Sequence, residues 1–535
     1  MTCLLSSLLS FVLADPYINI FLSPLFQCLQ KPACMFSNAA KLLLLISLYF
    51  GIKCLQLNNT KAAYLLLPVK YRLNIDLWEY SILLDLQRHA LIKAQRRRAK
   101  MNPTYLYDVD DTLPVQRGLI YGLQWAFIMF PALIIAASLV VGSLGPGHGD
   151  KVRFLQLTLL TSGLFTMVQT LWGHRYPLLE GPSTALMLAF ILLAPLGLPA
   201  IQGGTIIGGG LLILTVLSKQ LDRLIKLFTP NVVGVILILI ALGLLRPLLR
   251  FMIGAAEIHP LPKGQTFLIS LFLVLLIATL SHWLMRFWKS VSILVGMCIG
   301  SVVFLALGQL DWHGLLSASW VSLSPQWIES VPGFSWPAAI AFACAYLAVM
   351  VNTLGSIQSI AVITDTGRLQ TATHRGILVN GVAGLSCGLL GIVGTVSFSM
   401  SPGVILANRV ASRFAITYCG AILLVAAFLP KLAALLALVP TPVVGAALCV
   451  GMGGQVGVGI STIASQKIES RDYFVVGLPV LLGTMVGFLP GGMFDALPGP
   501  IQVFVGNSLI VGIALVLLLE HLILRKRKSS PATSK

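Results

Sequence analysis

A short apolar run reads Val396-Ser397-Phe398-Ser399-Met400-Ser401-Pro402-Gly403-Val404-Ile405, and Ser-Pro-Gly interrupts it where an unbroken membrane helix would be expected. Proline in the first turn of a helix needs no N–H partner, and the preceding serines can cap the exposed amides, so a helix is predicted to begin at Pro402. A helix that begins inside a bilayer is costly unless its free backbone groups face protein or a cavity. The run therefore predicts a half-helix.

A second break of the same kind lies upstream, in Leu178-Leu179-Glu180-Gly181-Pro182-Ser183-Thr184-Ala185. Two interrupted segments in matching positions of two halves are the best sequence indication of a transporter's binding site. Residues 178–182 and 396–401 are predicted to be extended and adjacent near mid-membrane. The half-helices are predicted to begin close to Gly181 and Pro402, with their N-termini pointing toward one another.

Composition is typical of a polytopic membrane protein. The chain has 535 residues, 57% of them hydrophobic and 10% charged, and a mean hydropathy of +0.91, far from the balance of a soluble domain. The net charge of +18 does not indicate nucleic-acid binding, because the basic residues lie between apolar runs and at the tail, where orientation in the membrane explains them. Nine cysteines are scattered without ligand spacing, so no metal site is predicted.

The first hundred residues differ in character from the rest of the chain. The first fifteen lack the charged region of a signal peptide, residues 39–55 could form one membrane helix, and residues 88–100 are a basic run. One interpretation makes Met101 the true initiator, and the other makes the basic run a cytoplasmic anchor after an extra helix. The chain is accordingly divided into a leader (1–100), a cytoplasmic lead (101–117), a transporter body (118–524) and a basic cytoplasmic tail (525–535).

The body is a regular series of apolar runs. A spanning helix needs about 20 apolar residues, and fourteen runs are long enough to span or to enter and stop. They lie near 118–142, 155–173, 182–198, 203–218, 231–250, 266–285, 290–308, 336–361, 376–395, 402–412, 414–429, 438–460, 472–489 and 502–523. With the lead inside, twelve basic residues fall in cytoplasmic loops and four in the tail, against six in outside loops. This bias predicts that both termini are cytoplasmic.

An internal repeat relates the two halves of the body. The Gly-spaced segment that begins at Gly163 returns at Gly381, 218 residues later, and the breaks at Pro182 and Pro402 are 220 apart. Thr229-Pro230-Asn231-Val232-Val233-Gly234 returns as Thr441-Pro442-Val443-Val444-Gly445, with the glycines 211 apart. Seven spans per half is an odd number, so the second half is predicted to be inverted relative to the first.

These motifs, in this order, resemble the nucleobase–ascorbate transporter family, also called nucleobase:cation symporters, which includes uracil and xanthine permeases. The resemblance runs from about Asp108 to Leu524, and it also rests on Gly122-Leu123-Gln124-Trp125, Leu160-Thr161-Ser162-Gly163, and His374-Arg375-Gly376 with Asn380-Gly381. It implies an all-α polytopic membrane protein of fourteen segments in two inverted seven-helix repeats. Segments 1–4 and 8–11 would form a core domain and segments 5–7 and 12–14 a gate domain. Segments 3 and 10 would each pair a short strand with a half-helix, and the base would bind between them.

The sequence departs from this family at the expected site. The resemblance places a glutamate in the eighth helix, where this chain has Asn352, and an acidic or amide residue at the start of the tenth half-helix, where it has Met400 followed by Ser401. The first helix has Gln124-Trp125 in place of Gln-His. The carboxylates that would bind a base and carry coupling are missing.

Among the acidic residues of the body, only Glu180 is placed to face a cavity at membrane depth. An intramembrane carboxylate is a functional candidate by default, so Glu180 is the candidate for coupling. The alternative is a solvated salt bridge with the nearby His174-Arg175 at the cytoplasmic side. Coupling to H+ or Na+ stays open, and no cofactor is expected.

The remaining site candidates are neutral. Asn352 offers both a donor and an acceptor to a base edge or a carboxylate, although a lone asparagine can also hold helices together. Amides at half-helix N-termini favour an anion or a carbonyl oxygen, and aromatic rings can stack on a planar base or simply pack. The full set of substrate-binding candidates is Asn352, Gln124, Gln358, Ser183, Thr184, Ser399, Met400, Ser401, Trp125 and Phe398.

Three functional classes are candidates. The first is a secondary transporter of nucleobases such as xanthine, uracil or related planar heterocycles, by alternating access of core against gate. The second is an anion transporter of the sulfate or carboxylate type on the same fold. The third, a membrane enzyme, lacks paired acids, a His cluster or a nucleophile–base pair at membrane depth. The expected partners are a small-molecule substrate, the lipid bilayer of a bacterial inner membrane, and a second copy through the gate domain.

Overall fold

The computed structural model describes residues 105–144, 150–255, 261–285, 287–310, 312–322, 328, 330–489, 493, 497 and 505–525. The chain divides into two units, Met1–Asn102 and Pro103–Lys535. The predicted leader and most of the basic tail lie outside the described residues.

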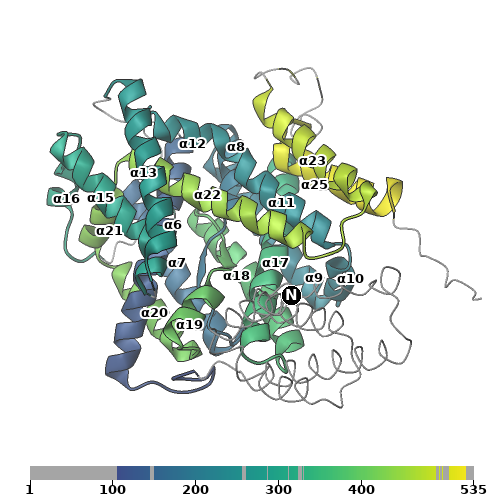
Figure 1. Cartoon of the computed structure of the whole chain (residues 1–535), viewed down its shortest axis with the longest axis horizontal. Helices are drawn as coiled ribbons and strands as arrows, with labels where there is room; N and C mark the ends of the chain where they lie inside the picture. The colour runs from purple at the N-terminus through teal and green to yellow at the C-terminus, as the bar shows by residue number, and fades with distance from the viewer. Residues whose placement is uncertain are drawn as a thin grey trace, which may run out of the picture. The chain divides into compact units, whose positions relative to one another are not determined.

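The described body consists almost entirely of helices (Figure 1). Before the second half of the chain the elements are α6 (Val115–Leu144), α7 (Lys151–Leu171), β1 (Glu180–Pro182), α8 (Thr184–Leu193), η2 (Ala194–Leu196), α9 (Leu198–Leu217), α10 (Leu221–Ile225), α11 (Pro230–Gly243), α12 (Leu245–Met252), α13 (Lys263–Trp283), α14 (Phe287–Ser290), α15 (Ser292–Ala306) and α16 (His313–Ser317). The later elements are α17 (Trp336–Ile363), α18 (Leu369–Leu390), β2 (Thr395–Ser397), α19 (Ser401–Asn408), α20 (Arg413–Ala426), α21 (Pro430–Ala437), α22 (Thr441–Ile463), α23 (Ser470–Phe488), α25 (Ser508–Leu518) and η3 (Leu519–Ile523).

Eight of the described helices are long and apolar enough to cross a membrane, or nine if the bent pair α20 and α21 is counted as one span. Each of the fourteen predicted apolar runs contains a helix or part of one. Several of these helices are short, among them α8, α15 and α25. The structure therefore agrees with an all-α membrane protein, while the count of fourteen spans stays a prediction.

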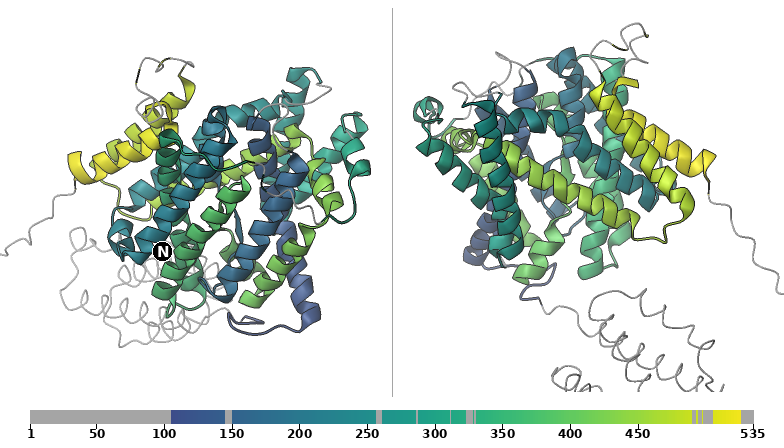
Figure 2. Two further views of the ribbon diagram at one scale, coloured as in Figure 1. Left: turned by 180° about the vertical axis from the view of Figure 1, so that it is seen from behind. Right: turned by 45° about the horizontal axis from the view of Figure 1, so that its top comes forward.

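Helix packing follows the predicted repeat. In the first group of helices, α9 packs against α17 and α18, and α20 packs in the same manner against α6 and α7. If the halves are matched in order, α9 corresponds to α20, α17 to α6 and α18 to α7, so the two sets of contacts are equivalent. In the second group α11 packs against α22, and the C-terminal helices α23 and α25 lie side by side (Figure 2). This reciprocity is what two related halves would produce.

Glycines allow the closest helix approaches, at the positions that marked the repeat. A Cβ on Gly163 of α7 would lie 2.7 Å from the carbonyl oxygen of Gly420 and 2.6 Å from the amide nitrogen of Leu424, both on α20. A Cβ on Gly381 of α18 would lie 2.9 Å from the carbonyl oxygen of Gly209 on α9. Backbones can approach this closely only where neither residue carries a side chain.

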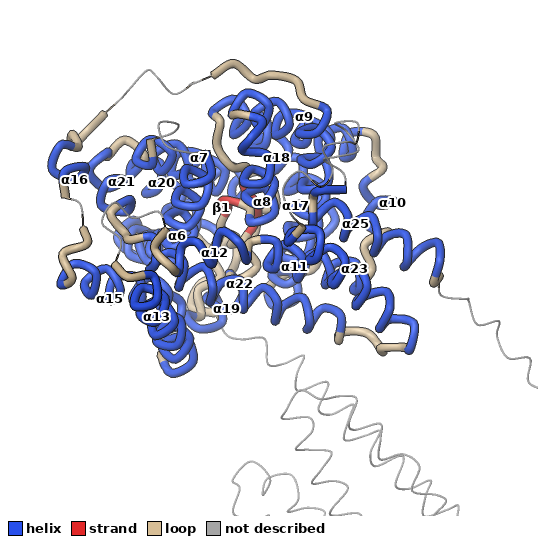
Figure 3. The backbone as a smooth tube through the Cα atoms, turned by 90° about the horizontal axis from the view of Figure 1, so that it is seen from above, coloured by secondary structure: helices blue, strands red, loops and turns tan. Residues whose placement is uncertain are grey.

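The two predicted breaks meet as a short antiparallel ribbon. Glu180 pairs with Ser397, Gly181 with Val396 and Pro182 with Thr395, and the ribbon lies among the surrounding helices (Figure 3). The prediction that the two segments are extended and adjacent is confirmed. Their bounds differ by a few residues from the predicted 178–182 and 396–401.

The half-helices begin near, but not at, the predicted residues. The first begins at Thr184 and not at Gly181, because Pro182 ends the strand and Ser183 is the N-cap, whose hydroxyl accepts from the amide of Leu186. The second begins at Ser401, one residue before Pro402. The prediction of serine capping there is wrong: the N-cap is Met400, which makes no side-chain cap, and the Ser401 hydroxyl donates to the carbonyl of Phe398.

The lead pairs with the segment that joins α19 to α20. Tyr107 forms a parallel bridge with Val410, and the amide of Arg413 donates to the carbonyl of Val109. Asp110 makes ion pairs with Arg368 at 2.6 Å and with Arg413 at 2.7 Å. Hydrogen bonding by these guanidinium groups, Arg368 first, lowers the pKa of Asp110 to about 2.

Two buried acidic residues in the second helix group hold helix ends together. Asp472 and Glu520 both accept hydrogen bonds from the Asn231 amide, and Glu520 also pairs with Arg471 at 2.9 Å. These contacts tie the start of α11 to the start of α23 and to η3. Since each of these carboxylates has an arginine or amide donor, the group needs no ligand to satisfy it.

Candidate functional site

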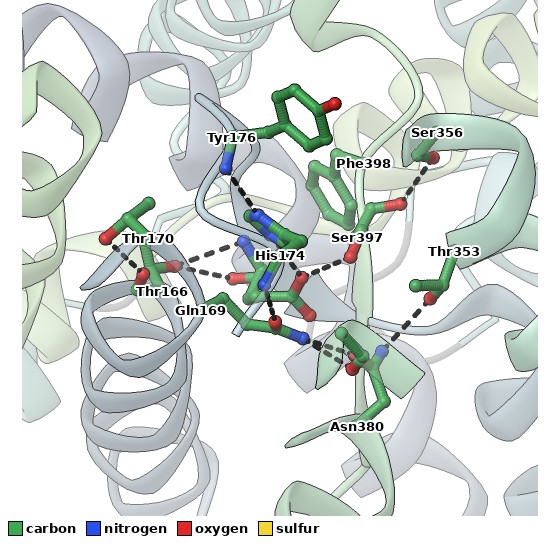
Figure 4. A network of polar contacts seen from close by, with 12 residues as sticks. Thr166, Gln169, Thr170, His174, Tyr176, Thr353, Ser356, Asn380, Ser397 and Phe398 are labelled. Atoms are coloured by element: carbon green, nitrogen blue, oxygen red, sulfur yellow. Dashed lines mark hydrogen bonds and ion pairs between the residues drawn. The ribbon is translucent and has the colours of Figure 1, made fainter. Parts of the chain in front are cut away.

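The ribbon carries a buried carboxyl group at the centre of a polar network (Figure 4). Glu180 is fully buried, and its Oε1 accepts a hydrogen bond from the Ser397 hydroxyl on the opposite strand. Its Oε2 is buried without a hydrogen-bond partner among the described residues. The backbone amide of Glu180 donates to the Thr166 hydroxyl on α7 at 3.1 Å, which holds the start of the strand in place.

His174 lies beside this carboxyl group, with its Nε2 3.7 Å from Glu180 Oε1 and both side chains fully buried. The backbone amide of Tyr176 donates to His174 Nδ1 at 3.0 Å. A nitrogen that accepts a hydrogen bond cannot carry a proton, so the ring is neutral and its proton is on Nε2, toward Glu180. The expected solvated salt bridge is therefore wrong: the contact is buried, His174 is uncharged in this arrangement, and Arg175 is exposed.

A chain of amides connects His174 to α17. The Gln169 carbonyl oxygen accepts from the backbone amide of His174 at 3.3 Å, and its amide nitrogen donates to Asn380 Oδ1 at 2.5 Å. Asn380 in turn donates to the Thr353 hydroxyl at 3.1 Å. All three amide and hydroxyl side chains are buried. This arm crosses from α7 through α18 to the residue directly after Asn352.

A second, shorter arm reaches α17 through the other strand. The Ser356 hydroxyl donates to the carbonyl of Ser397 at 2.9 Å, while the Ser397 hydroxyl donates to Glu180. Thr353 and Ser356 are three residues apart, so they lie on the same face of α17. The Glu180 carboxyl group is therefore linked to this helix face through Ser397, and the amide chain reaches the same face from the backbone of His174.

The sequence-predicted residues differ in how far the structure buries their side chains. Glu180, Trp125, Ser183 and Ser401 are buried; Asn352, Gln124, Thr184 and Phe398 are partly buried; Ser399, Met400 and Gln358 are exposed. Phe398 lies directly against the ribbon, since its ring would be 2.7 Å from a Cβ on Gly181. Thr184 donates to Gln455 on α22 at 3.4 Å, across the two helix groups. Only Glu180 belongs to the buried network.

Sequence reasoning missed six members of the network: Thr166, Gln169, Thr353, Ser356, Asn380 and Ser397. It named His174 beside Glu180, six residues away, but as part of a solvated contact. Asn380 stood in one of the motifs that carried the family resemblance, but nothing in the sequence paired it with Gln169. Within the described ranges, no three His, Cys, Asp or Glu side chains gather closely enough to hold a metal ion.

Solved structures with a similar fold are membrane transporters. The transmembrane domain of a cyanobacterial bicarbonate transporter, BicA, matches with a TM-score of 0.52 at 16% identity, over 71% of this chain and 97% of that one. The murine anion transporter Slc26a9 matches in its inward-facing state with a TM-score of 0.51 at 13% identity, over 77% of this chain and 69% of that one. At such identities the likeness shows the fold alone.

Sequence comparison then gives the family. The family model for xanthine and uracil permeases, described as the permease family, matches residues 117–492, and this chain belongs to that family. Among its relatives, the uric acid permease PucK of Bacillus subtilis is 25% identical over 77% of this chain and 96% of its own length. The nucleobase transporter PlUacP of Paenibacillus larvae is 25% identical over 77% of this chain and 95% of its own length.

Proposed function

We propose that this protein is a secondary active transporter of nucleobases such as xanthine, uracil, uric acid or related planar heterocycles. The observation that carries the proposal is the ribbon of β1 and β2 with a half-helix after each strand, in a chain whose family is one of permeases. Half-helices that begin inside a membrane protein leave free amides, which favour carbonyl oxygens or anionic groups of a ligand. The names of the relatives supply the substrate class.

The partly buried residues near the ribbon suit a planar, polar ring. Asn352 is on α17, adjacent to Thr353 of the buried network, and its amide makes no hydrogen bond to any other described residue. An amide can pair with the donor and acceptor edge of a base. Phe398 packs on Gly181 beside the half-helix starts and offers a ring for stacking. The proposed binding set is Asn352 and Phe398 with Gln124, Trp125, Ser183, Thr184, Ser399, Met400, Ser401 and Gln358 around them.

Transport would proceed by movement of the core domain against the gate domain. One of the contacts between the two groups is the long hydrogen bond from Thr184 to Gln455, which can break and re-form at small cost. We further propose fourteen spans with both termini cytoplasmic, location in a bacterial inner membrane, coupling to H+ or Na+, and pairing of two copies through the gate domain. The basic loops and the family resemblance support these points.

The alternative substrate is a small anion. The similar fold of the bicarbonate transporter BicA and the absence of a carboxylate at position 352 favour it. The sequence relatives point to nucleobases instead, and they match this chain at higher identity than the anion transporters do.

Ligand binding can separate the two substrate classes. A ligand that binds only the folded state stabilises it by RT ln(1 + [L]/Kd), about 2.7 kcal/mol at a hundredfold excess over Kd. Thermal stabilisation of detergent-purified protein by xanthine, uracil or uric acid, followed by counterflow of the radiolabelled base in proteoliposomes, is the expected result. Stabilisation and counterflow with bicarbonate or sulfate, and with none of the bases, would refute the nucleobase assignment.

A further inference from the structure

The strongest unassigned feature of the body is the buried pair Glu180 and His174. Both side chains are fully buried, and Glu180 Oε2 and His174 Nε2 are each without a hydrogen-bond partner among the described residues. Buried polar atoms in native proteins are normally satisfied, so two such atoms in one contact mark this pair as a candidate functional site. An intramembrane carboxyl group next to a neutral imidazole is a chemically competent place for a proton.

We propose that Glu180 is the proton-binding group that couples transport, with neutral His174 as its neighbour, and that its protonation is transmitted to α17 through Ser397 and Ser356. The inference rests on the proposed transport function and assigns it a coupling ion. It also gives the site an acid, since position 352 carries an asparagine.

The surroundings of Glu180 leave one titratable neighbour. The polar groups around it are Thr166 and Gln169 from α7, Ser397 from β2 and His174 from the preceding loop, while α6, which also packs on β1, has no buried titratable side chain. Of these groups only His174 can change charge. Its Nδ1 accepts from the Tyr176 amide, so a second proton there would break that bond.

A proton on Glu180 would change the arm that runs through Ser397. Ionised Glu180 accepts a charge-assisted hydrogen bond from Ser397, which is roughly twice as strong as a neutral one. Protonation weakens that bond and therefore the hold of β1 on β2, whose carbonyl at Ser397 accepts from Ser356 on α17. Since β2 leads into α19, the same change would also act on the start of the second half-helix.

The proton balance is simple. One proton from water on one side of the membrane adds to the Glu180 carboxylate when the site opens to that side, and the same proton leaves to water on the other side. Glu180 has no exposed surface in this structure, so the described state is closed to water around the carboxyl group. His174 is followed directly by exposed Arg175.

Glu180→Gln is the decisive variant, because the amide keeps an oxygen for the Ser397 hydroxyl but cannot gain or lose a proton. In proteoliposomes with an internal pH dye, wild type should move protons together with xanthine or uracil. Glu180→Gln should carry xanthine counterflow with at least a tenfold lower proton flux per xanthine, and Glu180→Asp should regain proton flux with a shifted pH profile. Asp222→Asn, at an exposed acid, is the matched control and should behave as wild type.

Two results would overturn the inference while leaving the transport function intact. One is xanthine or uracil flux by wild type without proton flux, and the other is a proton flux in Glu180→Gln equal to that of wild type. If none of the bases is transported, the proposed function fails, and infrared difference spectroscopy decides the proton site alone. A pH-dependent carboxyl C=O band that disappears in Glu180→Gln and shifts in Glu180→Asp supports it, and a band unchanged in both variants overturns it.

Discussion

Replacing Gly163 by alanine should destabilise the protein far more than the size of a methyl group suggests. The added Cβ would lie 2.6 Å from the amide nitrogen of Leu424 and 2.7 Å from the carbonyl oxygen of Gly420. Both atoms belong to the backbone of α20, so no side chain can rotate away and the two helices must separate. Overpacking of this kind costs about 1–3 kcal/mol, against the roughly 1 kcal/mol that alanine gains over glycine in a helix.

Gly381, which the repeat relates to Gly163, provides a second test, and Gly210 on α9 provides the control. Gly381→Ala would meet the Gly209 carbonyl oxygen at 2.9 Å and Ile213 Cγ1 at 2.7 Å, and it should lower stability by a similar amount. Gly210, in the same helix as Gly209, has nothing within 4 Å of an added Cβ, so Gly210→Ala should be neutral or stabilising by up to about 1 kcal/mol. Thermal melts in detergent would rank the three. Equal stability of Gly163→Ala and Gly210→Ala would refute the close helix contact.

Three further outcomes are expected. Asp110 has a folded pKa of about 2 against an ordinary 3.8, so its stabilising effect is complete above pH 4 and is lost as the pH falls toward 2. Because the carboxyl group is half exposed, the effect should stay near 1 kcal/mol. The melting temperature of Asp110→Asn should therefore depend less on pH over that range than that of the wild type. Asn380→Leu strands the Thr353 hydroxyl and one bond of Gln169 and should cost roughly 1–3 kcal/mol in thermal melts, whereas Thr462→Val, on an exposed face of α22, should not. Asn352→Asp should add a second step to the pH dependence of uptake of a labelled base, and in the Glu180→Gln background it should restore a pH dependence.

The breaks and the repeat were predictable because they depend on local chemistry. The two breaks gather serine, proline and glycine within a few residues of an apolar run, and such clusters favour a helix boundary, whereas Pro131 and Pro479 lie singly inside α6 and α23. The packing of Gly163 and Gly381 follows from their place in two similar halves. The exact helix starts were less predictable. Whether Ser401 caps its helix or bonds to Phe398 depends on the path of the preceding strand, and that path is set by its partner strand.

The network around Glu180 could not be predicted from the sequence. Gln169 and Asn380 are 211 residues apart and Glu180 and Ser397 are 217 apart, yet each pair is hydrogen bonded. Such pairs arise only when two halves fold onto one another, and no spacing in the chain indicates them. His174 lies only six residues before Glu180 and could be placed near it, but the orientation of its ring depends on the backbone amide of Tyr176.

Asn352→Asp tests whether position 352 on α17 and the Glu180 network act on the same substrate. Asn352 precedes Thr353 on α17, and Thr353 and Ser356 are the two points at which the Glu180 network meets that helix. A carboxylate at position 352 would restore the acid that the family resemblance places there, one helix face away from Glu180.

In the Glu180→Gln background it should return proton flux to at least part of the wild-type level, because a titratable group again lies between substrate and ribbon. With Glu180 intact, two acids near one substrate should add a second step to the pH profile of uptake, since neighbouring carboxyl groups titrate in separate macroscopic steps. Asn352→Ala should weaken base binding by about tenfold, the value of one hydrogen bond near the upper end of the usual range. If the aspartate variant shows the wild-type pH profile and cannot restore flux without Glu180, position 352 does not face the substrate, and binding must rest on Phe398 and the half-helix amides instead.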